Sequence, residues 1–194
     1  TKTPDLPAIV LADSCYHSLF ENWSSLTKTP DLNSENIVYD CYAYMFAGCT
    51  SLTEAPELPA TELAYGCYER MFMNCTHLTT APELPATELA NYCYYYMFSY
   101  CTSLTEAPEL PATIMKSYCY ERMFENTSIT SSPELPATEL AGGCYRAMFL
   151  NCKNLSEAPE LPATVMKPYC YNGMFEYTAL TDAPELSSTI MEPY

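Results

Sequence analysis

The chain has 194 residues, of which 48% are hydrophobic, and a net charge of −16 from 24 acidic and 8 basic residues. This length is sufficient for one sizeable hydrophobic core, and no apolar run approaches the roughly 18 residues that a membrane-spanning helix needs. The acidic excess argues against nucleic acids and anionic membranes, because both bind to basic faces. We therefore expect neither nucleic-acid binding nor membrane insertion.

The chain begins inside a repeating pattern. Residues 1–7 match the second half of a repeat, and residues 191–194 match residues 166–169, which precede a Cys-Tyr pair. We therefore expect the chain to be a fragment of a longer protein. The lack of a visible signal peptide then carries no information about its targeting.

A Cys-Tyr pair recurs at steps of 25 or 26 residues along the whole chain. It stands at Cys15-Tyr16, Cys41-Tyr42, Cys67-Tyr68, Cys93-Tyr94, Cys119-Tyr120, Cys144-Tyr145 and Cys170-Tyr171. A fixed period in the range of about 20 to 50 residues is typical of stacked-repeat architectures. We predict that residues 1–194 form one elongated domain of about seven repeats.

The first element expected in each repeat is a short strand, for example over residues 52–59. Leu52, Ala55 and Leu58 are apolar, and Pro56 and Pro59 limit a strand to three or four residues. The pattern predicts a short parallel strand that ends in a proline-bounded turn.

The second expected element is a short α-helix between Thr61 and Asn74. Leu63, Cys67 and Met71 are spaced by four residues and would form one apolar stripe. Thr61 can act as the N-cap, and Asn74 falls where a left-handed C-terminal residue is wanted. Asn126, Asn151 and Gly48 take the place of Asn74 in other repeats. A single unit cannot bury this stripe, so neighbouring units must stack. The predicted fold is a right-handed α/β solenoid.

These residues resemble the bacterial leucine-rich repeat family of the BspA-like, or Treponema, type. The segment 71–78 reads Met-Phe-Met-Asn-Cys-Thr-His-Leu and is followed by Ala-Pro-Glu-Leu-Pro at 81–85. The resemblance covers essentially the whole chain. It implies a leucine-rich-repeat solenoid in an extracellular protein of the bacterial cell surface, used for adhesion to a host or bacterial protein or glycan.

The eleven cysteines fall into two columns. Seven belong to the Cys-Tyr pairs, and four follow eight residues later: Cys49, Cys75, Cys101 and Cys152. Trp23 replaces the second Cys in the first full repeat, and the shorter spacing near Thr127 and Thr178 indicates that the second Cys is deleted there. Because the first Cys persists in all three repeats, the two columns are not obligate partners.

Helix geometry also argues against disulfides between the two columns. Eight residues of helix span about 12 Å, whereas a disulfide requires Cα atoms within about 7 Å. Zinc ligation is disfavoured because the spacing is wrong and only His17 and His77 could assist. We expect buried free thiols and no metal, with disulfides as the alternative.

An acidic residue stands between the Pro and the Leu of every expected strand. We call this set the acidic ladder: Asp5, Asp31, Glu57, Glu83, Glu109, Glu134, Glu160 and Glu185. Stacked strands would place these like charges about 4.8 Å apart, which is unfavourable. The ladder either binds cations or a basic partner, or is a solvated face that keeps the protein soluble. The candidate binding residues are Glu57, Glu83, Glu109, Glu134 and Glu160.

One repeat is unusually rich in tyrosine, with Tyr92, Tyr95 and Tyr96 beside the repeated Tyr94. Tyrosine is favoured at interfaces, so these three are further candidate binding residues. The tyrosines that recur in every repeat are better explained by packing. Arg70 and Arg122 share one position and can pair with neighbouring Glu residues.

No set of residues suggests an enzyme or a cofactor. The singular polar residues are His17, His77, Trp23 and Lys153, and none accompanies a recognisable nucleophile or acid–base pair. A carboxylate-lined solenoid that acts on polysaccharides would need a basic residue that breaks the pattern, for which Lys153 is a weak candidate. We predict a non-enzymatic protein without a cofactor.

Two functions remain open from the sequence. The chain is either a cell-surface interaction module that binds a host protein or glycan, or a structural spacer that projects another domain and has no ligand. The two differ in whether variable positions such as Tyr65, Asn91, Ser117 and Gly142 gather on one face with the Tyr-rich repeat. Uncapped repeat ends also predict end-to-end self-association of the fragment.

Overall fold

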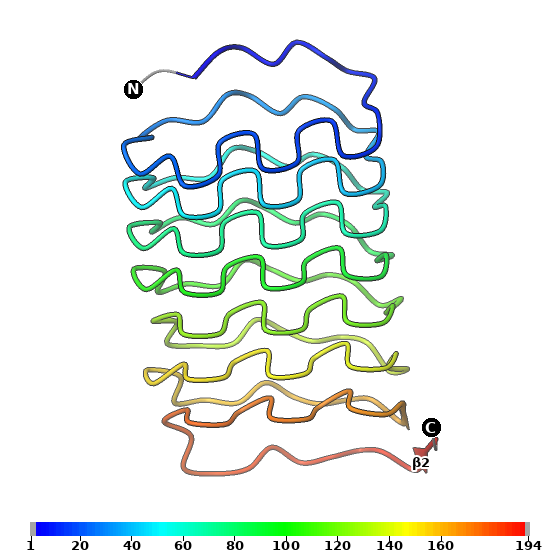
Figure 1. Ribbon diagram of the computed structural model, residues 1–194. Helices are drawn as coiled ribbons and strands as arrows, with labels where there is room; N and C mark the ends of the chain where they lie inside the picture. The colour runs from blue at the N-terminus through cyan, green and yellow to red at the C-terminus, as the bar shows by residue number, and fades with distance from the viewer. Residues whose placement is uncertain (1–2, 193–194) are drawn as a thin grey trace.

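The computed structural model describes residues 3–192 as a stack of coils, one for each Cys-Tyr pair (Figure 1). In Figure 1 a square-wave segment runs along the front of each coil, and a smoother segment runs behind it. We name each coil after the Cys of its Cys-Tyr pair. The repeat predicted from the sequence is therefore the unit of the stack.

The short α-helix predicted in each repeat is wrong, because no helix forms within residues 3–192. The square-wave segment, which we call the turn ladder, replaces it from two residues before each Cys to eight after it. In the Cys67 coil, residue pairs 67–68 and 71–72 are buried, whereas pairs 69–70 and 73–74 are partly or fully exposed. The side chains thus alternate two inward and two outward, a period of four residues.

Two sets of backbone hydrogen bonds build the turn ladder. Within a coil, the N–H of Cys67 donates to the Ala64 carbonyl at 3.3 Å, and that of Met71 to the Tyr68 carbonyl at 3.2 Å. Between coils, the N–H of Tyr68 donates to the carbonyl of Cys93 at 3.1 Å. Because alternate amides bond within and between coils, the ladder satisfies its backbone without a helix or a regular strand.

Every fourth residue of the turn ladder has a positive φ, as at Arg70 (52°) and Asn74 (62°). This conformation costs a residue other than glycine about 1–2 kcal/mol. The left-handed conformation predicted for Asn74, Asn126, Asn151 and Gly48 is confirmed. These residues belong to continuing turns, however, and do not end a helix.

The inward side chains form columns that run through the stack. Rings of the Phe column, from Phe20 to Phe175, stack on their neighbours with centroids 5.6–5.8 Å apart. The tyrosines of the Cys-Tyr pairs stack in the same way at 5.7–6.0 Å. Fully burying each such side chain stabilises by roughly 1.5–3 kcal/mol before conformational entropy is subtracted. The packing role predicted for the repeated tyrosines is confirmed.

All eleven cysteines are free, and all except Cys15 are buried, as the sequence predicts. The second column donates its thiols to phenylalanine carbonyls of the preceding coil, for example Cys75 Sγ to Phe46 O at 3.1 Å. The sequence predicted that the second Cys is deleted near Thr127, and this prediction is wrong about which residue is missing. Thr127 occupies the place of the second Cys, 3.4 Å from Cys152 Sγ, and its hydroxyl donates to Phe124 O at 2.8 Å. The missing residue therefore lies after Thr127.

The parallel strands predicted over segments such as 52–59 are wrong in their position, because no regular strand forms in those segments within residues 3–192. The only strands within residues 3–192 are β1 (Val165–Met166) and β2 (Ile190–Met191), which pair in parallel with Val165 opposite Ile190. β1 lies just before a Cys-Tyr pair, in the segment where the helix was expected, and single bridges such as Glu62 to Glu88 join most of the other coils at this position. In the predicted 52–59 segment a single parallel bridge joins Glu54 to Thr80. None of the described residues forms a helix long and apolar enough to cross a membrane.

Candidate functional site

The acidic ladder is exposed along the smoother side of the stack. Each of its eight members, including the candidates Glu57, Glu83, Glu109, Glu134 and Glu160, is exposed. Ladder residues of neighbouring coils line shared shallow hollows, such as one of about 600 Å³ that includes Glu160 and Glu185. Within residues 3–192 no cluster of three or more His, Cys, Asp or Glu side chains is placed to hold a metal ion.

The three candidate tyrosines lie together on the outward side of the turn ladder. Tyr92 contacts Tyr95 edge to face with ring centroids 5.4 Å apart, and Tyr95 contacts Tyr96 at 4.4 Å. All three rings are partly exposed. The acidic and the tyrosine candidates therefore belong to two different segments of each coil and do not form one site.

The variable positions before each Cys join this tyrosine cluster. The ring of Tyr65 lies 5.3 Å from that of Tyr92, and Tyr92 stacks on Tyr118 at 5.1 Å. The N–H of Ser117 donates to Asn91 Oδ1 at 3.0 Å. Non-repeating side chains thus gather on one face.

Every arginine of the chain lies on this same face. The Arg70 guanidinium stands over the rings of Tyr44, Tyr95 and Tyr96 at 5.2, 5.0 and 4.9 Å. Arg122 stands over Tyr96 at 5.5 Å. Cation–π contacts of this kind contribute about 0.5–2 kcal/mol each, depending on how far the cation is desolvated.

The ion pairs predicted for Arg70 and Arg122 are confirmed. Arg70 pairs with Glu69 at 3.0 Å and also donates to the Tyr44 hydroxyl. Arg122 pairs with Glu125 at 3.0 Å. Arg146, which the sequence did not single out, pairs with Glu121 at 3.3 Å. We call Tyr44, Arg70, Tyr95, Tyr96, Arg122 and Arg146 the Arg–Tyr strip.

The carboxylates of these pairs lie deeper than the guanidinium groups. The side chains of Glu121 and Glu125 are 6% and 7% exposed, compared with 28% for Arg122 and 40% for Arg146. Burial raises the pKa of Glu121, against the lowering effect of Arg146 and Arg122. Burial also raises the pKa of Glu69, opposed by Arg70. The strip therefore presents cations and aromatic rings outward and keeps its carboxylates beneath them.

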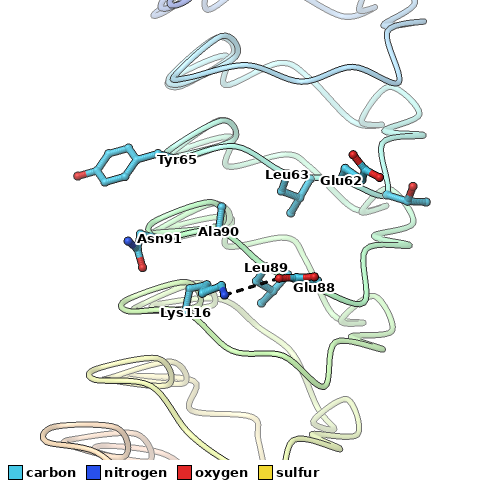
Figure 2. Close-up of a pocket in the computed structure, with 9 residues that line it drawn as sticks. Glu62, Leu63, Tyr65, Glu88, Leu89, Ala90, Asn91 and Lys116 are labelled. Atoms are coloured by element: carbon cyan, nitrogen blue, oxygen red, sulfur yellow. Dashed lines mark ion pairs between the residues drawn. The ribbon is translucent and has the colours of Figure 1, made fainter.

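A hollow of about 500 Å³ lies at the edge of this face between neighbouring coils (Figure 2). Leu63, Leu89 and Asn91 are among the residues that line it, and Lys116 pairs with Glu88 there at 3.6 Å. The sequence did not predict this hollow, because the residues come from three repeats and no shared motif connects them.

The singular polar residues do not assemble into a catalytic group. His77 Nδ1 lies 2.6 Å from the carbonyl oxygen of Thr50, whereas the ring of His17 packs against that of Tyr44 at 5.4 Å. The indole of Trp23 donates to Ser25. Each of these three residues thus has its own local partner, and these contacts do not join one of the three to another.

Comparison with known proteins identifies the family. The BspA type leucine-rich repeat region matches in six copies over residues 13–156 and 68–190. The crystal structure of a leucine-rich repeat protein from Bacteroides ovatus is similar at 17% identity with a TM-score of 0.38, over 90% of this chain and 59% of that one. A comparison with curated proteins gave no match. The chain spans less than two thirds of the length of the Bacteroides protein. The family match covers most of the chain, which therefore belongs to the BspA-type leucine-rich repeat family.

Proposed function

We propose that the chain is a non-enzymatic protein-interaction module that recognises its partner with the outward face of the turn ladder. One observation carries this proposal. Inward positions repeat almost unchanged from coil to coil, whereas the equivalent outward pairs Ala43-Tyr44, Tyr95-Tyr96 and Arg146-Ala147 differ from one another and from the Glu-Arg pair that stands at 69–70 and 121–122. A scaffold that only spans distance has no need of differing residues on one face.

The location follows from family membership as part of the same proposal. BspA-type repeats are commonly surface-associated, which supports an extracellular module at the bacterial cell surface that adheres to a host or bacterial protein or glycan. We further propose that residues 1–194 form one right-handed solenoid domain. The termini at residues 1–2 and 193–194 lie outside the described residues.

Self-association is a separate part of the proposal. The amides of Tyr171, Gly173 and Phe175 occupy the donor positions that reach the next coil elsewhere in the stack, and among residues 3–192 none has an acceptor there. Apolar side chains near this end are exposed, including Ile190 and Met191. An end-to-end dimer would pair these donors with the carbonyls of the Cys15 coil. Sedimentation that shows a strict monomer at high concentration would contradict this part.

Binding to an array of matrix proteins and glycans tests the main proposal. One variant changes Glu57, Glu83, Glu109 and Glu160 to Gln, and a second changes Tyr95 and other outward tyrosines to Ser. We expect the tyrosine variant to lose binding and the acidic-ladder variant to retain it. The reverse result would assign recognition to the acidic ladder. No binding by the unaltered chain would favour the spacer.

A further inference from the structure

We propose that the Arg–Tyr strip docks an acidic peptide segment of a partner protein. This inference rests on the proposed function and names the chemistry of the partner. It starts from the layering of charge on the strip. Arg122 and Arg146 are partly exposed, whereas their carboxylate partners Glu125 and Glu121 are nearly buried; in the Arg70–Glu69 pair the two side chains are 25% and 19% exposed. An approaching molecule therefore meets guanidinium groups before it meets carboxylates.

The guanidinium groups keep donors for a partner. Arg70 binds Tyr44 and Glu69 through Nη1, and Arg122 binds Glu125 through Nη1. A guanidinium carries five N–H donors in a planar fork that matches a carboxylate. Because Arg70 and Arg122 each make these hydrogen bonds through Nη1, the Nη2 atom of each remains available to donate to a partner. A peptide carboxylate is the group that this fork recognises best.

The strip is held in place before a partner arrives. Arg70 is packed among three tyrosine rings and fixed by an ion pair with Glu69. Arg122 shares the ring of Tyr96 with Arg70. Ordering a long side chain on binding costs about 0.5–1.5 kcal/mol, and this part of the cost is already met in the free protein. Tyrosine and arginine are also the residue types enriched at binding hot spots.

The composition of the whole outward face fits a protein partner better than a glycan. Every glycine and every arginine of the chain occupies an outward position of the turn ladder, together with most tyrosines outside the repeated column. Tyr, Ser, Gly and Asn, with Arg at the centre, are the residues that protein-binding paratopes use. The ring of Tyr92 also stacks on that of Tyr118 and contacts that of Tyr65 at an interplanar angle of 45°, so neighbouring rings cover much of Tyr92 and leave less of it open to a sugar ring.

The overall acidity of the chain does not oppose this partner. The acidic ladder lies on the smoother segments behind the turn ladders (Figure 1). At physiological ionic strength the interaction between exposed charges is screened beyond about 8 Å. An acidic segment on the strip is therefore screened from the acidic ladder, and it meets guanidinium groups whose charge is balanced by Glu69, Glu121 and Glu125 within the strip.

Fluorescence anisotropy tests the inference with a labelled peptide of alternating Glu, Ser and Asp residues. Its counterpart with Gln and Asn in place of Glu and Asp is the peptide control. We expect the acidic peptide to bind and the neutral one not to bind. Changing Arg70 and Arg122 to Gln should weaken binding by about tenfold or more, as expected for a hot spot. The charge-matched control changes Lys28 and Lys153, which are exposed outside the turn ladder.

A second variant guards against a folding defect. Arg146→Gln alters the most exposed arginine of the strip and should reduce affinity severalfold; because it also removes a partner of the nearly buried Glu121, its affinity is measured where circular dichroism shows the variant fully folded. Equal losses in the lysine control, no binding of the acidic peptide, or tighter binding of oligogalacturonate would each overturn the inference. If a protein found in the binding array bound the Arg70/Arg122 variant as well as it binds the unaltered chain, the inference would be overturned. The proposed function as an interaction module would still stand.

Discussion

At the scale of single residues, burial controls the chemistry of the thiols. Burial raises the pKa of Cys41 and Cys49 to about 11 and that of Cys119 to about 12. The thiolate is the reactive form of cysteine, so these side chains are inert although they are free. Cys15 differs because its side chain is exposed.

We therefore expect one fast phase when the native protein reacts with a chromogenic disulfide reagent at pH 8. Its amplitude should correspond to one thiol per chain and should disappear in Cys15→Ser. Unfolding in urea should release the remaining cysteines. Several fast thiols in the native Cys15→Ser variant would contradict the buried columns.

Glycine is required at particular outward positions. Gly66 has a φ of 58°, and a Cβ atom there would lie 2.0 Å from Asp40 Oδ1. Gly142 lacks a positive φ, and the nearest atom to its Cβ would be Pro168 O at 3.6 Å. We expect Gly66→Ala to lower the free energy of unfolding by about 1–2 kcal/mol or more. Gly142→Ala should be neutral or stabilising by up to about 1 kcal/mol. If urea denaturation showed the same change in the free energy of unfolding for both variants, the left-handed conformation of Gly66 would be contradicted.

At the scale of the elements, the aromatic columns join neighbouring coils. Phe98 is fully buried between the rings of Phe72 and Phe124, whereas Phe175 lies in the last coil and is partly exposed. Phe98→Ala should cost about 3–5 kcal/mol, and Phe175→Ala distinctly less. Calorimetry can measure both. Similar costs would show that the column does not carry the stacking energy.

The same scale shows what the sequence could and could not predict. The spacing of the Cys-Tyr pairs and the phenylalanines predicted the stacking unit and its core. The helix between Thr61 and Asn74 was wrong because a period of 4.0 and the helical period of 3.6 diverge little over so few residues. Arg146 could not be assigned to the site, because its contact with Glu121 depends on which residues point outward. Only the observed alternation of inward and outward residue pairs shows that Arg146 and Arg122 lie on the same face.

At the scale of the whole molecule, charge makes stability depend on pH in an unusual direction. Burial raises the pKa values of Asp40, Glu69 and Glu121 in the folded chain. The folded chain then binds more protons than the unfolded chain, so the stabilisation is complete below the ordinary carboxyl pKa of about 4 and is lost as pH rises through the folded values. Relief of the net charge of −16 acts in the same direction.

We therefore expect the free energy of unfolding to increase as the pH is lowered from neutral toward about 4.5. Glu121→Gln should reduce this slope because it removes one of the titrating groups. Chemical denaturation at several pH values measures both effects. Stability that falls steadily with acidification would contradict the burial of these carboxylates.

The turn ladder is the feature on which the outward face depends, and two buried alanines test it most directly. Ala147 in the turn ladder of the Cys144 coil has a φ of 51°, whereas Ala43 in that of the Cys41 coil has no positive φ. Changing Ala43 to Gly should cost about 1 kcal/mol or more from lost burial and added chain entropy. Changing Ala147 to Gly should cost about 1–2 kcal/mol less, because the left-handed strain is relieved. Urea denaturation that shows the same loss of about 1 kcal/mol for both variants, as in an α-helix, would contradict the turn ladder.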